Sequence, residues 1–330
     1  MKKIGILIFL GIMIVLIISI YIPKDSNSQN EKLFSIYKGQ GGKEIAINLE
    51  KEDLIKNATL FRFYVLTVRN ADNLQAGDYF LSSAMTIAEI AGKISSGDVA
   101  KVKVTIPEGF NLDKIDKRFK SKNEWIIVPD SFKNELAKDY KDKFEFLNNA
   151  PNNATLEGFL FPDTYHFSLR TDINEIALRI LNNFNKKLTP DLREEINNQG
   201  KTVFQIITMA SLIEKEVRTI EDKKLVSGVL WKRLENHIPL QVDATITYIT
   251  GKESTKVSKK ETQIDSPYNT YKYQGLPVGP ISNPGIESIK AAIYPENNEY
   301  LYYLSTPKGE TIFSKTLEEH NTAKAKYLWR

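Results

Sequence analysis

The amino-acid sequence predicts an α+β protein, and three observations support that fold class. Helical and strand-like segments follow one another without the regular alternation that builds a parallel sheet. A strand–turn–helix pattern occurs twice, at 76–97 and 102–121, and apolar residues recur at helical spacing in the second half of each copy. The 330 residues are 42% hydrophobic and 26% charged, a composition typical of globular proteins with a packed core. We therefore expect two or three folded domains.

The other elements are predicted from periodicity. Apolar residues recur on one face of a helix at 172–187, whereas apolar and polar residues alternate over 240–250 as they do in a strand. Thr86 and Asn111 are the predicted N-caps of the two repeated helices. The remaining predictions are a strand at 42–50, a helix within 51–66, polar helical segments at 122–155 broken near 148–153, helices at 203–218 and 221–237, a short helix at 286–293, a strand at 300–305 and a helix at 320–330.

The N-terminus contains a long apolar run. After lysines at positions 2 and 3, residues 4–22 carry no charge. At ~1.5 Å per residue this run spans roughly 28 Å as a helix, close to the thickness of a bilayer core. It is longer than the apolar region of a cleaved signal peptide and has no small-residue cleavage site; a cleaved signal would leave the compartment unchanged. We expect 1–23 to be a cytoplasmic tip and a single transmembrane anchor in the cell membrane, 24–40 a polar linker, and the rest extracytoplasmic.

Composition argues against several classes of protein. The net charge of +4 arises from 45 basic and 41 acidic residues, a near balance that gives no support for nucleic-acid binding. The chain has no cysteine, which excludes disulfides, thiol catalysis and cysteine-ligated zinc. Its three histidines, His166, His237 and His320, are far apart in the sequence, and the motifs of zinc proteases, phosphate-binding loops and serine hydrolases are missing. We expect neither a metal nor a cofactor.

One acidic residue stands within an apolar, aromatic run. Glu157 lies in TLEGFLFPDTYHF, residues 155–167. If the run is extended, Glu157, Phe159 and Phe161 share one face. Desolvation there raises the pKa of the carboxyl group from ~4.3 towards neutrality, as a general acid requires. We further expect Gly158 to leave space for a substrate beside the backbone. The plain alternative is an acid at a strand end that points to water or pairs with an arginine.

Two further segments carry candidate binding residues. In ASLIEKEV, residues 210–217, Glu214 and Glu216 lie near the end of an apolar helix, where they either orient a sugar or form a solvated helix end. In SPYNTYKYQGLPVGPISNPG, residues 266–285, tyrosines and an asparagine precede a stiff loop rich in proline and glycine. Aromatic faces and amide groups suit a carbohydrate, because rings stack on C–H faces and amides bond hydroxyl groups. A purely structural loop is the alternative.

These motifs, in this order, resemble those of one family. LEGFLFPDTY, ASLIEKE, SPYNTY and GLPVGPISNPG, together with AGDYF, MTIAEI and IPEGF, resemble the endolytic murein transglycosylase, or YceG-like, family over nearly the whole chain from residue 40. The resemblance implies a membrane-anchored lyase that cuts nascent peptidoglycan strands between N-acetylmuramic acid and N-acetylglucosamine. The product would carry 1,6-anhydro-muramyl ends, which terminates strand elongation. A LysM-like region, taken as 41–121, and a catalytic region at 122–330 are also implied.

The resemblance also assigns roles to residues. The family's catalytic glutamate corresponds to Glu157, which would protonate the glycosidic oxygen as an acid and then accept the proton of the muramyl C6 hydroxyl group as a base. No water is added, so no second carboxylate is required, in contrast to glycoside hydrolases. Phe159, Phe161 and Tyr165 stand where other members carry tryptophan, which keeps the surroundings apolar but changes the surfaces for sugar stacking. The residues carried over as substrate-binding are Glu214, Glu216, Tyr268, Asn269, Tyr271 and Asn283, with the loop 275–285 as a wall of the groove.

Two alternatives stay open on the sequence. A muramidase would hydrolyse the same bond and would need a second carboxylate, for which Glu214, Glu216 and Asp243 are the candidates. A non-catalytic scaffold would use the LysM-like region to hold peptidoglycan near the synthesis machinery. The expected partners are peptidoglycan glycan strands, the cell membrane through one span and peptidoglycan synthases, with no nucleic acid.

Overall fold

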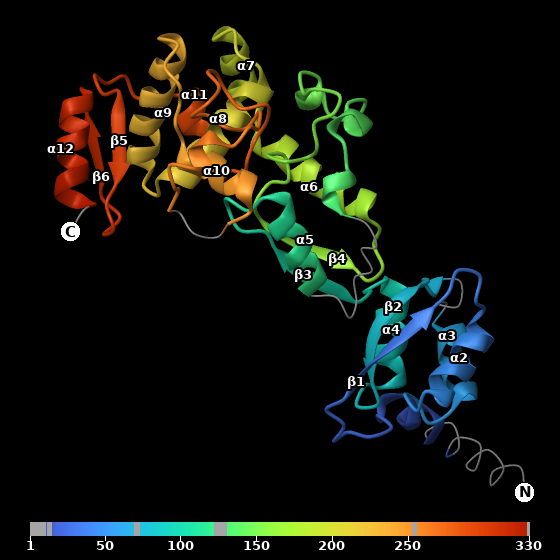
Figure 1. The fold of residues 1–330 in the computed structure, drawn as a ribbon. Helices are drawn as coiled ribbons and strands as arrows, with labels where there is room; N and C mark the ends of the chain where they lie inside the picture. Colours follow the sequence, from blue (N-terminus) through green and yellow to red (C-terminus); the bar gives the residue numbers. More distant parts are fainter. Residues whose placement is uncertain (1–10, 12–14, 69–72, 122–130, 253–255, 329–330) are drawn as a thin grey trace, which may run out of the picture. The chain divides into compact units, whose positions relative to one another are not determined.

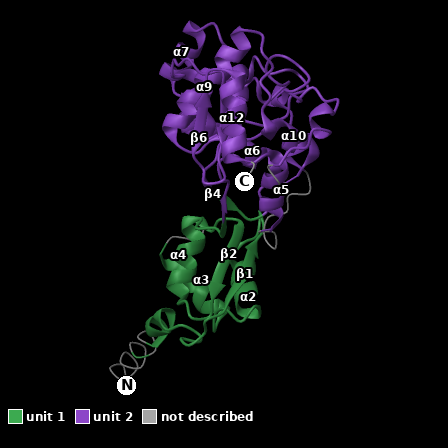
Figure 2. Ribbon diagram, turned by 60° about the vertical axis from the view of Figure 1, so that its left-hand side comes forward, with its two compact units in different colours: residues 1–102, 166–169 green, residues 103–165, 170–330 purple. Residues whose placement is uncertain are grey.

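The computed structural model describes residues 11, 15–68, 73–121, 131–252 and 256–328 (Figure 1). The chain forms two compact units, one of residues 1–102 and 166–169 and one of residues 103–165 and 170–330 (Figure 2). Both contain helices together with two-stranded sheets, so the α+β fold class is confirmed. The predicted division into a linker, a LysM-like region and a catalytic region stays a prediction.

Most of the predicted membrane span lies outside the described residues. Residues 15–21 of it are helical. Within the described part of the chain, no helix combines the length and the apolar character needed to cross a bilayer. The transmembrane anchor therefore stays a prediction.

In the first unit, two antiparallel strands are connected through two helices, and a third helix follows. The elements are β1 (Glu31–Ile36), α2 (Gly42–Lys51), α3 (Ala58–Thr67), β2 (Gly77–Ser82) and α4 (Ile87–Ser96). β1 pairs with β2 in a register that places Glu31 opposite Ser82. Thr86 caps α4 and exchanges hydrogen bonds with Glu89 in a capping box. The strand–turn–helix predicted at 76–97 and its N-cap are confirmed.

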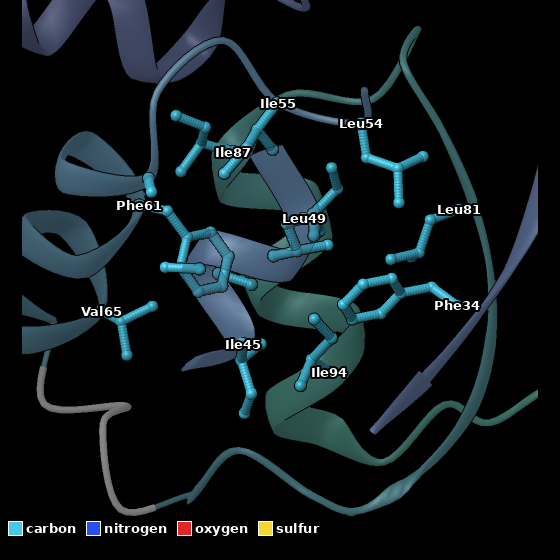
Figure 3. Close-up of a cluster of buried hydrophobic side chains, with 14 of the residues drawn as sticks. Phe34, Ile45, Leu49, Leu54, Ile55, Phe61, Val65, Leu81, Ile87 and Ile94 are labelled. Atoms are coloured by element: carbon cyan, nitrogen blue, oxygen red, sulfur yellow. The ribbon is translucent and has the colours of Figure 1, made fainter. Parts of the chain in front are cut away.

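The core of the first unit is built from both strands and from α2, α3 and α4 (Figure 3). Phe34 and Leu81 from the strands join Leu49 of α2 and Phe61 of α3, and each of these side chains is buried. Burying a large apolar side chain contributes about 1.5–3 kcal/mol, so this cluster is a main source of stability. Ile20, near the end of the predicted span, belongs to the same cluster and is 4% exposed. The end of the described N-terminal helical residues is thus part of this core.

Two predicted strands are helices, and those predictions were wrong. Residues 42–50 lie in α2, and most of 240–250 forms α10 (Asp243–Thr250). Apolar residues at every second position also place every fourth residue on one helical face, as Ile45 and Leu49 show. A short alternating run fits both periods, so packing against the rest of the unit decides between them.

The second unit is mainly helical. Its strands are β3 (Lys101–Thr105), which pairs with β4 (Thr164–Ser168), and β5 (Tyr302–Ser305), which pairs antiparallel with β6 (Thr311–Ser314). Its other helices are α5 (Leu112–Ser121), α6 (Ile173–Lys187), α7 (Pro190–Asn198), α8 (Val203–Glu216), α9 (Ile220–Glu235), α11 (Ile286–Ile293) and α12 (Leu317–Tyr327). The division between the units falls inside β3 and β4. The predictions of α5, α6, α8, α9, α11, α12 and β5 are confirmed, whereas α7 and β6 were not predicted.

The polar helices predicted over 122–155 do not form in the described part of that range. Three short 3-10 helices occur instead, at Phe132–Asn134, Ala137–Tyr140 and Glu145–Leu147. Their aromatic residues are buried, so this segment is held by side-chain packing rather than by a continuous helix. Residues 122–130 lie outside the described residues.

α8 occupies the interior of the second unit. It packs against α9, α10 and α11, and eight consecutive residues, Ile206–Ile213, are buried. A helix that is buried around its whole circumference belongs to the centre of a domain. Glu214 and Glu216 follow this buried run at the C-terminal end of α8.

Candidate active site

Glu157 lies in a tight turn rather than in a strand. The Phe159 N–H donates to the Leu156 carbonyl oxygen over 3.0 Å, and Gly158 has a φ of +89°. The expectation that Glu157 and Phe159 share one face of an extended segment was therefore wrong. The turn still buries the carboxyl group, because the Glu157 residue is only 4% exposed.

Gly158 is required by the turn and by its neighbours. A side chain is rarely tolerated at its positive φ. A Cβ atom there would also lie 2.6 Å from Pro280 and 2.8 Å from the Ile207 side chain. The space beside Gly158 is filled by protein, so the expectation that it leaves room for a substrate was wrong. The glycine instead lets the Glu157 turn pack closely between α8 and the 275–285 loop.

An aromatic cluster supports the turn. Phe159 is fully buried, and its ring centroid lies 5.9 Å from that of Phe146, 5.5 Å from that of Phe184 and 6.3 Å from that of Phe204. Phe161 contacts Phe184 edge-on at 6.4 Å. These rings come from α6, α8 and the 3-10 segment. They keep water away from the turn that carries Glu157.

The Glu157 carboxylate has three hydrogen-bonding neighbours. Its Oε2 accepts a hydrogen bond from the Leu112 N–H at 3.1 Å and lies 3.4 Å from the Tyr248 hydroxyl oxygen. Its Oε1 accepts one from the Asn283 side-chain amide at 3.0 Å. Leu112 is the first residue of α5, whose unpaired N–H groups and dipole favour a negative charge. The amide nitrogen of Asn283 and the backbone N–H can only donate, whereas the tyrosine hydroxyl can donate or accept.

Burial raises the pKa of Glu157 to about 8. The cause is the loss of water around the charged form. The Leu112 N–H and the Tyr248 hydroxyl oppose this shift by stabilising the carboxylate, and the negative charge of Asp113 adds to it. Glu157 is therefore protonated at neutral pH, yet has donors in place for its ionised form.

Asn283 joins three loops around the carboxyl group. Its side-chain oxygen accepts a hydrogen bond from the Leu160 N–H at 2.8 Å, and its side-chain nitrogen donates to the Phe110 carbonyl oxygen at 2.9 Å as well as to Glu157. Its backbone N–H also donates to the Phe110 carbonyl oxygen, and its carbonyl oxygen accepts from the Gly109 N–H. Predicted to bind substrate, Asn283 lies fully buried and holds Glu157 in position.

Two tyrosines lie near the Glu157 carboxyl group. Tyr248 of α10 and Tyr268 are half-buried, and their ring centroids are 5.0 Å apart. The charge of Glu157 contributes to a raised pKa of Tyr268, whose main cause is burial. Tyr268 was predicted from the sequence and lies next to the carboxyl group. Tyr248 was not predicted, because its segment was taken as a strand.

Glu214 supports the loop that carries Asn283. Its Oε2 accepts hydrogen bonds from the Gly285 N–H at 3.1 Å and from the Ser288 hydroxyl at 2.6 Å, and it pairs with Lys223 at 3.3 Å. Both charged side chains are less than a tenth exposed. Glu214 was predicted as a cleft residue and lies in a buried ion pair. It also binds the N–H of Gly285, which is two positions after Asn283 in the same loop.

Glu216, Tyr271 and Asp243 form a second network with Tyr303. The Tyr303 hydroxyl donates to Glu216 at 3.0 Å, and the Tyr271 hydroxyl donates to Asp243. Burial, followed by the charge of Asp243, raises the pKa of Glu216 to about 7. α10 connects this network to the first one, because Asp243 begins the helix and Tyr248 lies five residues further along it.

Asn269 stabilises its own loop. Its side-chain nitrogen donates to the carbonyl oxygens of Ile264 at 2.7 Å and Thr262 at 3.1 Å, and its side-chain oxygen accepts from the Tyr271 N–H at 2.9 Å. The residue is 1% exposed. Its amide is thus used within the 262–271 loop, which presents Tyr268 to the carboxyl group.

The geometry defines a class of protein: an enzyme-like α+β unit with a buried, neutral carboxyl group, whose hydrogen-bonding neighbours come from the start of α5, from α10 and from the 275–285 loop. The profile of the YceG-like family matches residues 34–326. The chain belongs to the YceG-like family.

Named relatives agree with this assignment. The chain is 36% identical to the endolytic murein transglycosylase of Bacillus subtilis, over 93% of this chain and 87% of that protein. It is 30% identical to the endolytic murein transglycosylase of Streptococcus pneumoniae serotype 2, over 93% of this chain but only 60% of the pneumococcal protein. Among solved structures, a YceG-like protein from Listeria monocytogenes matches with a TM-score of 0.60 and 36% identity, over 90% of this chain and 100% of that one.

Proposed function

We propose that this protein is an endolytic lytic transglycosylase that cleaves peptidoglycan glycan strands, with Glu157 as its general acid and base. Relatives of the same family, matched over almost the full chain, carry the name of that enzyme. The observation that carries the proposal is the Glu157 carboxyl group, buried, neutral at pH 7 and bonded to donors on both oxygens.

The acid step uses the raised pKa. Protonated Glu157 gives its proton to the oxygen between N-acetylmuramic acid and N-acetylglucosamine while the bond to the muramyl C1 atom breaks. General acid catalysis of this kind contributes about 10²–10⁴-fold to a rate. Tyr248 and Tyr268 are the half-buried neighbours of the carboxyl group, so the sugar approaches from their side.

The base step uses the donors. Once ionised, Glu157 is stabilised by the Leu112 N–H at the start of α5 and by the Asn283 amide. It then accepts the proton of the muramyl C6 hydroxyl group as that oxygen bonds to C1 and closes the 1,6-anhydro ring. The carboxyl group ends the cycle protonated, so no proton is exchanged with water. The Tyr248 hydroxyl can accept from the protonated form and donate to the ionised form.

Hydrolysis by a second carboxylate has less support. The three sequence candidates for that role are held by other groups. Glu214 is paired with Lys223, Glu216 accepts from Tyr303, and Asp243 accepts from Tyr271. A carboxylate that activates water needs a free oxygen facing the sugar.

The setting of the enzyme is also part of the proposal. The uncharged run 4–22 would anchor the chain in the cell membrane and leave both units outside the cytoplasm. The first unit, with two helices between two paired strands, would be the LysM-like module that holds glycan strands. Peptidoglycan synthases would then be neighbours at the same membrane.

The test is digestion of purified glycan strands by the full chain in detergent, analysed by mass spectrometry. The full chain is needed because Ile20 is part of the first unit's core. Two matched variants accompany it: Glu157→Gln, and Glu194→Gln at an exposed position of α7. We expect anhydro-muramyl ends from the parent and from Glu194→Gln, and no cleavage by Glu157→Gln.

Other outcomes contradict specific parts. Products heavier by one water would show hydrolysis and overturn the lyase reaction. Full activity of Glu157→Gln would overturn the role of Glu157. Binding of glycan without cleavage by every variant would favour the non-catalytic scaffold.

A further inference from the structure

α3 in the first unit has an exposed apolar face. Phe61 and Val65 point into the core and are buried, as Figure 3 shows. On the opposite side, Phe63 is 42% exposed and Leu66 is 62% exposed. Exposed large apolar side chains that lie side by side usually mark a contact surface.

α3 carries a single charged residue, which is basic. Its sequence, ATLFRFYVLT, contains no acidic residue, and its single charged residue, Arg62, is exposed beside Phe63. α2 is different, because its exposed Ile47 stands among Lys43, Glu44 and Glu50. An apolar face with a cation fits the interface of an anionic bilayer, where rings enter the acyl boundary and the guanidinium meets headgroups.

The end of the predicted membrane span lies against this helix. The Tyr64 side chain of α3 has Tyr21 as a neighbour, which adds to the effect of burial in raising the pKa of Tyr64. Tyr21 is 59% exposed and Ile22 is 48% exposed, whereas Ile20, within the helical residues 15–21, is buried in the core. The chain therefore reaches the first unit without a flexible spacer, next to the apolar face.

We propose that this face of α3, formed by Arg62, Phe63 and Leu66, lies in the membrane interface and seats the first unit directly on the bilayer. The inference rests on the proposed membrane anchor. The span ends at residue 22, and Ile20 fixes it to the unit, so the surface next to Tyr21 is at the level where the chain leaves the lipid. Tyrosines are enriched at that level. The lipid surface therefore lies next to the α3 face. A second copy of the chain could cover this face only by displacing the lipid.

The consequence is a fixed height for the first unit. A unit held through both a span and an apolar face binds glycan only near the membrane surface. Two membrane contacts also bind far more tightly than one, because the second forms within the same molecule. Nascent strands, rather than the outer wall, are the ligands that such a unit would meet.

The chain has no cysteine, so single nitroxide labels test the proposal in the full protein. Phe63→Cys and Leu66→Cys report on the α3 face. Ile47→Cys on α2 and Tyr37→Cys, at 48% and 60% exposed, are matched controls. Each labelled full chain is reconstituted into vesicles of phosphatidylcholine and phosphatidylglycerol, and collisions with oxygen and with a water-soluble nickel complex are measured.

We expect oxygen collisions to dominate at positions 63 and 66, as in lipid, and nickel collisions to dominate at 37 and 47. Nickel-accessible labels at 63 and 66 in protein that floats with the vesicles would overturn this inference while the anchor stands. Failure to float would remove the anchor itself, and with it the inference. Dipolar broadening between labels at 66 would show that a second copy covers the face, which also overturns it.

Discussion

The side-chain amide of Asn283 donates a hydrogen bond to Oε1 of Glu157 over 3.0 Å, although 126 positions separate the two residues in the sequence. The same amide is fixed by the Leu160 N–H on its oxygen and by the Phe110 carbonyl oxygen on its nitrogen. Its donor atom therefore cannot turn away from Glu157 without losing both bonds. The carboxyl group is held by a network that is complete only when three distant loops have folded together.

Replacing Asn283 with aspartate tests that network. Asn283→Asp removes the two donors and places a second carboxyl group beside Glu157. A hydrogen bond to a charged group contributes about 1.5–3 kcal/mol, so we expect the cleavage rate to fall roughly 10- to 100-fold. The measurement is the initial rate on purified glycan strands, with circular dichroism to confirm folding. Asn197→Asp, at an exposed position of α7, is the control. An unchanged rate would mean that the Asn283 bond is irrelevant to catalysis.

Removing the hydroxyl of Tyr248 tests its part in the proton cycle. Tyr248→Phe keeps the ring packed on Tyr268 and removes the oxygen 3.4 Å from Glu157. That hydroxyl lowers the pKa of Glu157, so its loss raises the pKa further above about 8. The acid must be protonated, and the upper limb of the pH–rate profile should therefore move to higher pH while the maximal rate falls. Tyr294→Phe, at an exposed tyrosine, should change neither. A lower rate with an unmoved profile would assign Tyr248 to substrate contact alone.

The sequence predicts the acid more readily than its partners. Glu157 stands out because a carboxylate in an aromatic run is costly to bury, and the family resemblance assigns it the role of the acid. The long helices follow from strong periodicity. Tyr248 could not be found in this way, since the alternation around it fits a strand as well as a helix. The Leu112 N–H carries no side-chain signal at all. The cues to that helix start are Asn111, the predicted N-cap, whose side chain accepts from the Lys114 N–H, and the proline and glycine of the IPEGF loop before it.

Residues that the sequence grouped together are separated by the fold. Glu214 and Glu216 are two positions apart on α8, so their side chains point in different directions and enter different networks. Asn269 and Asn283 were both expected to meet sugar hydroxyl groups, yet each amide is satisfied by protein. Only the three-dimensional structure decides which polar side chains are already paired, because their partners are distant in the sequence.

The stability of the protein should fall as pH rises through the range in which Glu157 ionises. Its pKa is raised from an ordinary 4.5 to about 8 in the folded state, so the folded state binds the proton more tightly. This contribution is fully present below about pH 4.5 and is lost as pH rises through about 8. Glu157→Gln cannot ionise, and its melting temperature relative to the parent should increase with pH. Glu216, whose pKa is about 7, contributes in the same direction and is unaffected by the substitution. A constant difference between the two proteins would contradict a neutral, buried Glu157.

Gly158 should be far less tolerant of a side chain than a glycine of similar backbone geometry. Gly158→Ala introduces a Cβ atom 2.6 Å from Pro280 in addition to the strain of its positive φ. Gly251 also has a positive φ, but a Cβ atom there meets nothing within 4 Å. We expect Gly251→Ala to lower the free energy of unfolding by about 1–2 kcal/mol, and Gly158→Ala by a further ~1–3 kcal/mol from overpacking. Denaturant unfolding of both variants measures the difference. Equal losses would show that Pro280 moves aside freely.

Breaking the buried pair between Glu214 and Lys223 should cost more unfolding free energy than breaking an exposed pair, and it should also slow catalysis. Lys223→Met leaves Glu214 buried without its counter-ion and should cost about 3–5 kcal/mol of unfolding free energy. Glu214→Gln leaves Lys223 buried alone and also weakens the bonds to Gly285 and Ser288. The double variant should lose less than the sum of the two single variants, because each single variant strands a charge. Glu287→Gln, which breaks an exposed pair with Lys290, should cost less than about 1 kcal/mol.

Since Gly285 follows Asn283 so closely, Glu214→Gln should also slow glycan cleavage, whereas Glu287→Gln should not. Additive losses in the double variant, or full activity of Glu214→Gln, would separate this ion pair from the positioning of Asn283.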